Sequence, residues 1–196
     1  MVDGKRKYEL KQRAEAMADT RLRITEAAVE LHGTIGPART TVSAVAERAG
    51  VQRHTVYRHF PTEQDLFAAC SAHWGTLHPW PDPAAGLDAL YRWYEETESM
   101  HANILRDAEL VDAVPQAMEP MLDYLEEVRR ALSSGLPRRK TVHAAVAHAV
   151  DFHTWRSLVR EGGLGRAQAV ELVSAMIERA ARPRPASARG SARPTA

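Results

Sequence analysis

The chain has 196 residues, enough to bury a sizeable core in one large domain or two small ones. Its single cysteine, Cys70, excludes an internal disulfide, and no stretch approaches the roughly 18 apolar residues of a membrane-spanning helix. The formal net charge is +1. The opening segment MVDGKRKYEL is charged rather than apolar, so we expect a soluble, cytoplasmic protein.

The charge is unevenly distributed along the chain. Residues 1–60 carry 11 Lys or Arg against 7 Asp or Glu, residues 61–181 carry 11 against 18, and residues 182–196 carry 4 Arg and no acid. Positive ends around an acidic middle favour a protein that docks on a polyanion through one face.

Residues 8–32 are predicted to be helical, as one long helix or two short ones. The inward stripe of this segment is Ile24, Ala27, Ala28 and Leu31. The leading residues 1–19 form a basic arm that either follows a nucleic-acid backbone or extends into solvent. Residues 33–40, which contain Gly36 and Pro37, are expected to form a loop.

Residues 41–60, TVSAVAERAGVQRHTVYRHF, are predicted to form two short helices joined by a turn. Thr41 is placed to cap the first helix, and Gly50 ends it because glycine tolerates left-handed backbone. Val51 can then fill the angle between the helices. The inward face of the first helix is Val42, Val45, Ala46 and Ala49.

The second helix of this pair is predicted over residues 53–59, with Val56 and Phe60 facing the core. In a helix-turn-helix the second helix lies in the major groove of DNA, and its first residues meet base edges. Arg53 is best placed to read a base, because its guanidinium can bind guanine O6 and N7 together, worth about 1–3 kcal/mol. Phosphate contacts are expected from Thr55, Tyr57 and His59.

His54 either adds a base or methyl contact or is a solvated surface residue. The full set of predicted DNA contacts is Thr41, Ser43, Gln52, Arg53, His54, Thr55, Tyr57, Arg58 and His59.

These residues resemble the DNA-binding signature of the tetracycline-repressor (TetR) family. The resemblance rests on Thr41, Val45-Ala46, Ala49-Gly50-Val51, Thr55-Val56-Tyr57 and His59-Phe60, and it covers residues 20–70. It implies a dimer of all-helical subunits, each with a three-helix DNA-binding head and a ligand-responsive body. The chain departs from the family at His54, where many members have a small residue, and at Glu63. Many members have a phosphate-contacting lysine at the latter position, so Glu63 is not counted as a contact.

Thr62 and Asp65 resemble a capping box, so a fourth helix is predicted to run to about His73. Three prolines, at positions 79, 81 and 83, then mark a boundary. Further helices are predicted over residues 85–98, 100–112, 115–134 with a break or kink at Pro120, 139–161 and 165–181.

No alternating strand pattern is found, so the expected fold class is all-α. The predicted units are the arm (1–19), the helix-turn-helix domain or head (20–66), a ligand-binding and dimerisation domain or body (67–181) and a disordered Pro/Ala/Ser/Arg-rich tail (182–196).

The last two predicted helices have apolar residues on more than one face, which suggests burial on two sides. These residues are Val142, Ala145, Val146, Ala149 and Val150, then Ala169, Leu172, Val173, Met176 and Ile177. The helices over 139–161 and 165–181 either pair with their copies in the homodimer that the resemblance implies or close the core of the monomer.

Aromatic and methionine side chains concentrate in the body, as in pockets between the helices of a bundle. The candidate residues of a small-molecule pocket are Trp74, Trp93, Tyr94, His101, Asn103, Asp107, Met121, Tyr124, His148 and Phe152.

No metal site, catalytic residue or cofactor is predicted. The histidines at 143, 148 and 153 recur at a spacing that turns successive side chains about 140° around a helix, so they cannot converge on one metal. Cys70 is expected to be a small core residue rather than a redox sensor. Neither a nucleophile elbow nor a phosphate-cradling glycine loop is present.

Together these features predict a ligand-responsive, DNA-binding transcriptional regulator: a homodimeric repressor released from its operator by a small molecule. An activator with the same head is the nearer alternative. An all-α small-molecule carrier or enzyme that no longer binds DNA is the alternative from another class, and the intact polar set over residues 53–59 argues against it.

Overall fold

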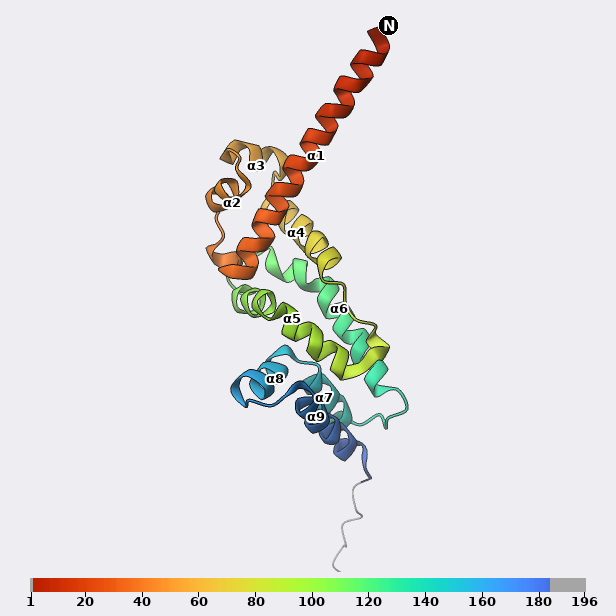
Figure 1. Cartoon of the computed structure of the whole chain (residues 1–196). Helices are drawn as coiled ribbons and strands as arrows, with labels where there is room; N and C mark the ends of the chain where they lie inside the picture. The colour runs from red at the N-terminus through yellow and green to blue at the C-terminus, as the bar shows by residue number, and fades with distance from the viewer. Residues whose placement is uncertain (1, 184–196) are drawn as a thin grey trace, which may run out of the picture.

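The computed structural model describes residues 2–183, and every regular element in that range is helical (Figure 1). The all-α class predicted from the sequence is therefore confirmed. Residue 1 and residues 184–196, which include most of the predicted tail, lie outside the described range. Within that range, no helix is both long and apolar enough to cross a membrane.

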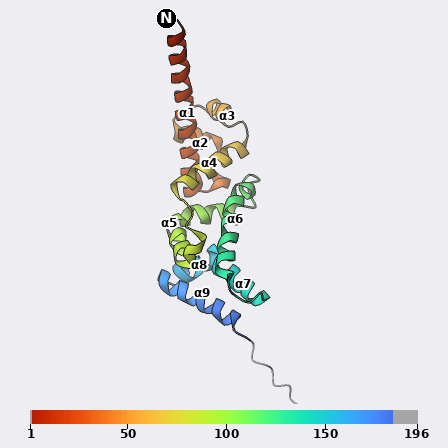
Figure 2. The ribbon, with the colours of Figure 1, turned by 90° about the vertical axis from the view of Figure 1, so that its right-hand side faces the viewer.

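The molecule is elongated, with the head at one end and the last helices at the other (Figure 1, Figure 2). The elements of the head are α1 (Val2–Thr34), η1 (Pro37–Arg39), α2 (Val42–Ala49) and α3 (Arg53–His59). The connecting helix α4 (Glu63–Leu77) leads into the body. The elements of the body are η2 (Pro83–Ala85), α5 (Gly86–Asp107), α6 (Val114–Ser133), α7 (Lys140–Ala149), α8 (Phe152–Arg156), η3 (Ser157–Glu161) and α9 (Arg166–Ala181).

The first helix is continuous rather than split in two, and its C-terminal half belongs to the core of the head. That core is formed by Ile24, Ala27 and Ala28 of α1 together with Val45, Ala46, Ala49, Val56 and Phe60. Residues 7–19 of the same helix are exposed and extend beyond the head (Figure 1). Residues 7–19 of the predicted arm are therefore an exposed helical continuation of α1, which is compatible with both predicted roles of the arm.

The predicted turn between α2 and α3 is confirmed. The Ala44 N–H donates a hydrogen bond to Thr41 Oγ1 at 3.1 Å, which caps α2. Gly50 has left-handed backbone, with φ 66°, and ends the helix. The Val51 N–H donates to Ala46 O at 2.9 Å, and this bond directs the chain toward α3.

The predicted capping box at the start of α4 is also confirmed. The Asp65 N–H donates to Thr62 Oγ1 and the Thr62 N–H donates to Asp65 Oδ2, each at 3.1 Å. The predicted end at His73 is wrong, since α4 continues to Leu77. Gly75 lies within α4 and does not end it. Pro79 restricts the backbone of His78, the residue before it, so the helix ends at that point.

α5 is one helix of 22 residues where the sequence predicts two, over residues 85–98 and 100–112. The predicted break is wrong because the buried stripe of the helix continues across it. Tyr94, Thr97 and His101 are all buried at helical spacing on this stripe.

α6 passes through Pro120, so the break allowed for at this position does not occur. A proline cannot donate a hydrogen bond to the carbonyl four residues earlier, which here belongs to Gln116. The helix continues because the residues that follow, Tyr124, Leu125 and Val128, are buried in the core of the body.

The single helix predicted over residues 139–161 is wrong, because α7 ends at Ala149. Asp151 begins a new helix by accepting hydrogen bonds from the N–H groups of His153 at 2.8 Å and Thr154 at 3.2 Å. An Asp side chain that caps a helix competes with continuation of the preceding one. The predicted helix over 165–181 agrees with α9 to within one residue.

Two buried tyrosines of α5 stabilise this interruption. Tyr91 Oη donates to Ala149 O at 2.9 Å, and Tyr94 Oη donates to Val150 O at 2.7 Å. Carbonyls at the end of a helix lack partners within it, and burying them unpaired would be costly. The hydroxyls therefore fix α7 and α8 to the centre of the body.

The head is joined to the body by polar side chains at the end of α5. Asn103 Nδ2 donates to the carbonyls of His32 and Gly33 at 3.0 and 2.9 Å. Arg106 Nη1 donates to Asn103 Oδ1 at 2.8 Å, and its Nη2 donates to Ile35 O at 3.1 Å. These bonds tie α5 to the C-terminal end of α1.

Asp107 completes this junction. Its carboxylate is 2% exposed and accepts hydrogen bonds from Arg106 Nε at 2.7 Å and from the Ala38 N–H at 3.0 Å. The hydrogen bond from Arg106 is the main cause that lowers the pKa of Asp107. Gly36 approaches the same network with φ 92° and ψ 159°, a region open essentially only to glycine.

Replacing Gly36 with alanine is expected to lower the free energy of unfolding by about 1–3 kcal/mol from backbone strain alone. A Cβ at this position would also collide with Arg106 Nη2 and Asp107 Oδ2. Denaturant unfolding measures the loss. Gly75→Ala is the matched control, since a Cβ there meets no atom within 4 Å. Equal stability of the two variants would contradict the close approach at the junction.

Candidate functional site

The polar face of α3 is open to solvent. Arg53, His54, Tyr57 and Arg58 are exposed, whereas Thr55 is partly buried. Arg53 Nη2 lies 3.3 Å from Tyr57 Oη as a hydrogen-bond donor, and the guanidinium stands 5.9 Å from the centre of the Tyr57 ring. Arg53 and Tyr57 therefore form a pair one helical turn apart on the exposed face.

Three other predicted contact residues lie next to this face. Thr41 and Ser43 are exposed at the start of α2, although the Thr41 hydroxyl is engaged in the cap. Gln52 is the exposed residue that precedes α3. The first turns of α2 and α3 thus present uncharged polar groups beside Arg53.

His59 differs from the other predicted contacts. Its ring is partly buried, and its Nε2 atom is buried without a hydrogen-bond partner. Burial, followed by the neighbouring charges of Arg58 and Arg21, lowers the pKa of His59. This residue is therefore placed behind the face rather than on it.

Two arginines of α1 fix the ends of α2 and α3. Arg21 donates a hydrogen bond to His59 O and stands 4.0 Å above the centre of the Phe60 ring. Arg23 Nη1 donates to Ala49 O at 3.0 Å. Cations at the C-terminal ends of helices complement the helix dipole. The sequence offered no local signal for these contacts, because the partners are far apart in the chain.

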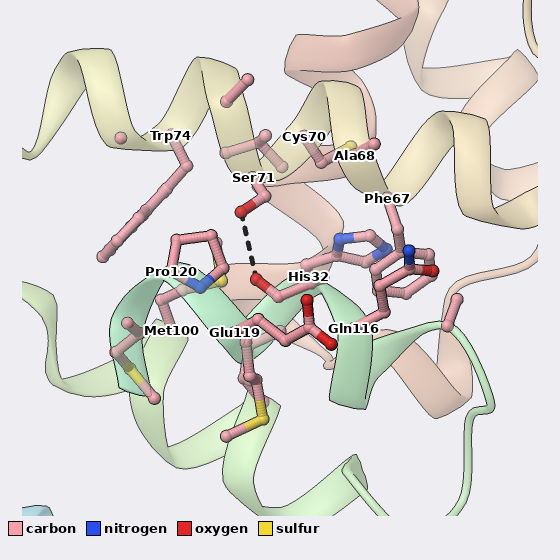
Figure 3. Close-up of a pocket in the computed structure, with 18 of the residues that line it drawn as sticks. His32, Phe67, Ala68, Cys70, Ser71, Trp74, Met100, Gln116, Glu119 and Pro120 are labelled. Atoms are coloured by element: carbon pink, nitrogen blue, oxygen red, sulfur yellow. Dashed lines mark hydrogen bonds between the residues drawn. The ribbon is translucent and has the colours of Figure 1, made fainter. Parts of the chain in front are cut away.

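A cavity of about 920 Å³ lies between α1, α4, α5 and α6 (Figure 3). Its walls are mainly apolar, with Phe67, Trp74, Met100, Ile104 and Met118 among the lining residues. Such a volume is within the range of small-molecule pockets. Ser71 Oγ donates to Ala117 O at 3.3 Å and links α4 to α6 at this cavity.

Only part of the predicted pocket set lines this cavity. The predicted residues that do so are Trp74, His101 and Met121. Trp93, Tyr94, Tyr124 and Phe152 instead belong to the buried core of the body. Asn103 and Asp107 form the junction with the head. His148 is exposed on α7, 3.1 Å from the Thr154 hydroxyl.

His32 and Cys70 also line the cavity, although the sequence analysis did not place them there. His32 is 4% exposed and stacks on Phe67 with ring centres 4.6 Å apart, and burial lowers its pKa to about 4. Burial raises the pKa of the Cys70 thiol to about 12, which suits a core residue and not a reactive thiolate. The sequence carries no local signal that residues of α1 line the cavity, because they reach it only through the packing of α1 on α4 and α5.

The described residues contain no group of three or more His, Cys, Asp or Glu side chains arranged to hold a metal ion. The candidate functional features are thus the exposed polar face of α3 and the apolar cavity beside α4.

The chain is similar in sequence to known bacterial transcriptional regulators. The family model described as "Bacterial regulatory proteins, tetR family" matches residues 24–70. The chain is 32% identical over 132 residues to HTH-type transcriptional repressor Rv3405c of Mycobacterium tuberculosis (strain ATCC 25618 / H37Rv). The same values hold for HTH-type transcriptional regulator Mb3439c of Mycobacterium bovis. Each match spans 65% of this chain and 66% of the relative, just under two thirds of the relative's length.

Solved structures share the fold. A transcriptional regulator from Rhodococcus sp. Rha1 superimposes with a TM-score of 0.58 at 21% identity, over 84% of this chain and 99% of that one. The multidrug binding protein EbrR, solved with imidazole, gives a TM-score of 0.52 at 23% identity, over 85% of this chain and 97% of that one.

Proposed function

We propose that the chain, whose residues 24–70 match the model of the tetR family of bacterial regulatory proteins, is a homodimeric transcriptional repressor released from its operator by a small molecule. The observation that carries this proposal is the position of the cavity, which is lined along much of its length by α4, the helix that follows α3. A molecule bound there would contact the connection between head and body.

In the proposed complex, α3 enters the major groove of double-stranded DNA. Arg53 reads a base, with Tyr57 beside it. The other predicted contacts except His59, which lies behind the exposed face, position the head on the phosphates. The exposed pair of Arg53 and Tyr57 supports this assignment. Positive charge in residues 1–60 supplies the attraction to phosphate, and the acidic body restricts docking to the head.

The proposed dimer forms through α7 and α9, within the predicted ranges 139–161 and 165–181. Both helices lie at the end of the molecule opposite the head (Figure 1, Figure 2). Leu172 of α9 is 52% exposed in the single chain, which supports a contact with a second copy. Two heads joined in this way would reach half-sites about 34 Å apart, one helical turn of DNA.

A ligand can release the protein from DNA only if it binds more tightly to a conformation in which the two heads do not fit successive major grooves. The cavity borders α4 and the end of α1, and it also borders α5 close to Asn103 and Asp107. A ligand that changes the packing of these helices would alter the tilt of the head relative to the dimer. Only a difference in affinity between the two states can drive this change.

An activator with the same head uses the same contacts, and it remains the nearer alternative. The relatives are named as transcriptional regulators, so we assign binding rather than catalysis to this chain. The cytoplasm is the proposed compartment because operator DNA is found there in bacteria.

Fluorescence anisotropy with labelled DNA from upstream of the chain's own gene tests the DNA-binding function. We expect selective binding over scrambled DNA, and with about 6–10 phosphate contacts an affinity loss of about 10³–10⁵ between 50 and 200 mM salt. Equal, salt-insensitive binding to both DNAs would contradict the proposal for this site.

A further inference from the structure

The cavity carries a negative charge on its open side. Glu119 of α6 lines the cavity and is also exposed, so it lies where the cavity meets solvent. Figure 3 shows its carboxylate directed into the space between α4 and α6. Within the part of the chain that the structure describes, Glu119 takes part in no ion pair, whereas Glu126 of the same helix pairs with Arg129 and Arg130. The Glu119 carboxylate is therefore open to a partner that enters from outside.

Asp65, the other carboxylate of the wall, is already engaged. It accepts hydrogen bonds from the Thr62 hydroxyl at 2.7 Å and from the Thr62 N–H at 3.1 Å, which hold it at the start of α4. A carboxylate in a capping box stabilises its helix, so a ligand that bound it in place of Thr62 would lose that contribution. Glu119 is thus the acidic side chain of the wall that can bind a ligand without disturbing a helix.

The side chains around Glu119 bring no opposing positive charge. Over their described lengths, α4 contains no lysine or arginine and α6 contains none before Arg129. The lining residues from α1 and α5 include no lysine or arginine either. His32 and His101 are uncharged near neutral pH, because burial lowers the pKa of each to about 4. The charge of the wall is therefore negative, and a cleft lined by charge of one sign concentrates the opposite ion.

The rest of the wall suits the apolar body of an organic cation. Its large side chains are Phe67, Trp74, Trp80, Met100, Met118 and Met121. The face of an aromatic ring attracts a cation, most strongly for tryptophan, and methionine adapts to irregular apolar shapes. Trp80 is 39% exposed and stacks on Tyr124 with ring centres 5.4 Å apart, so a tryptophan is held on the open side of the wall.

The position of the carboxylate decides how much of the ligand must lose water. A fully buried ion pair loses more hydration than it regains unless its geometry is excellent, whereas an exposed pair keeps most of its water. A cation at Glu119 would stay partly hydrated while the apolar body of the same molecule packs against Phe67 and Trp74. An anion at the same place would meet a carboxylate and find no cationic partner among the described lining residues.

We propose that the cavity binds a monovalent organic cation with a flat apolar body, whose positively charged group pairs with the Glu119 carboxylate. The body packs against the aromatic and methionine side chains, and the charged group stays on the open side of the cavity. This inference rests on the proposed function for its regulatory meaning, since it assigns a chemical class to the molecule that releases the protein from DNA. The binding event itself does not require DNA.

Isothermal titration calorimetry at pH 7 on the full chain, without DNA, tests the proposal with three probes of similar size. 2-Naphthylmethylamine carries an ammonium group at this pH, 2-naphthylmethanol is neutral, and 2-naphthoate is an anion. An exposed ion pair together with a cation–π contact is worth about fivefold to tenfold in affinity, so the amine should bind more tightly than the alcohol by this factor. The anion should bind more weakly than both, and added salt should reduce the preference for the amine.

Glu119→Gln removes the charge and keeps the shape of the side chain. It should lower the affinity for the amine about fivefold to tenfold, to that for the alcohol, and leave the affinity for the alcohol unchanged. Glu127→Gln is the matched control, because Glu127 lies on the same helix, is exposed and does not line the cavity. This control should bind all three probes as the original chain does. Both replaced side chains are exposed, so both variants should fold.

Four results would overturn the proposal: equal affinity for the amine and the alcohol, tighter binding of 2-naphthoate, no binding of any probe, or a preference for the amine that survives Glu119→Gln. These outcomes are separate from failure of the DNA function. If the amine binds as expected but the chain never binds DNA selectively in the anisotropy assay, the ligand assignment stands and the repressor assignment falls.

Discussion

Replacing Arg53 and Tyr57 together with alanine is expected to remove selective binding to operator DNA without unfolding the chain. Both side chains are exposed, so their loss leaves no cavity in the core of the head. One base contact by arginine is worth about 1–3 kcal/mol, and the proposed dimer makes this contact twice, so the affinity should fall at least roughly 30-fold. Anisotropy titration against operator and scrambled DNA measures the loss.

Arg130→Ala is the control for this variant, because the Arg130 side chain is 69% exposed on α6 in the body. It should bind operator DNA as the original chain does, and thermal unfolding should be the same for all three proteins. Loss of DNA binding with an unchanged melting temperature would eliminate the alternative of a carrier or enzyme that no longer binds DNA. Retained selective binding by the double variant would show that α3 does not read the operator.

Leu172→Asp should convert the proposed dimer into monomers and weaken operator binding by about 10²–10⁴-fold. Leu172 is 52% exposed in the single chain, so an aspartate there is compatible with the folded monomer. In the proposed dimer it would place a charge against apolar surface in both copies. Linking two binding modules raises the overall affinity by about 10²–10⁴, and that gain disappears when the heads separate.

Light scattering coupled to size-exclusion chromatography measures the mass of this variant. Leu122→Asp is the matched control, since Leu122 on α6 is 49% exposed. This control should keep the mass of a dimer. If the Leu172→Asp variant remains dimeric, or if the control dissociates equally, the dimer interface is not specific to α9.

The head could be predicted closely because its signals are local in the sequence. A hydroxyl at the N-cap, a glycine that adopts φ 66° and apolar residues at helical spacing each act within one or two turns. The capping box of Thr62 and Asp65 is a signal of the same kind. Each of these features was confirmed.

The boundaries within the body could not be predicted as well, because long-range contacts override local preference. α5 continues past residue 99 since its buried stripe packs on other helices. The interruption after α7 depends on Asp151 and on the hydroxyls of Tyr91 and Tyr94, which reach it from α5. An apolar stretch alone does not reveal which of its residues will meet such partners.

The sequence by itself determined the helical class and the helix-turn-helix, since these depend on periodicity and on short capping and turn signals. The same residues carry the resemblance to the tetR family. Only the tertiary structure decided the roles of the polar residues of α5. Asn103 and Asp107 join head to body, whereas His101, less than two turns away, lines the cavity. The physical reason is that hydrogen bonding and burial of these side chains depend on α1, α4 and α6, which are brought to α5 only when the chain folds.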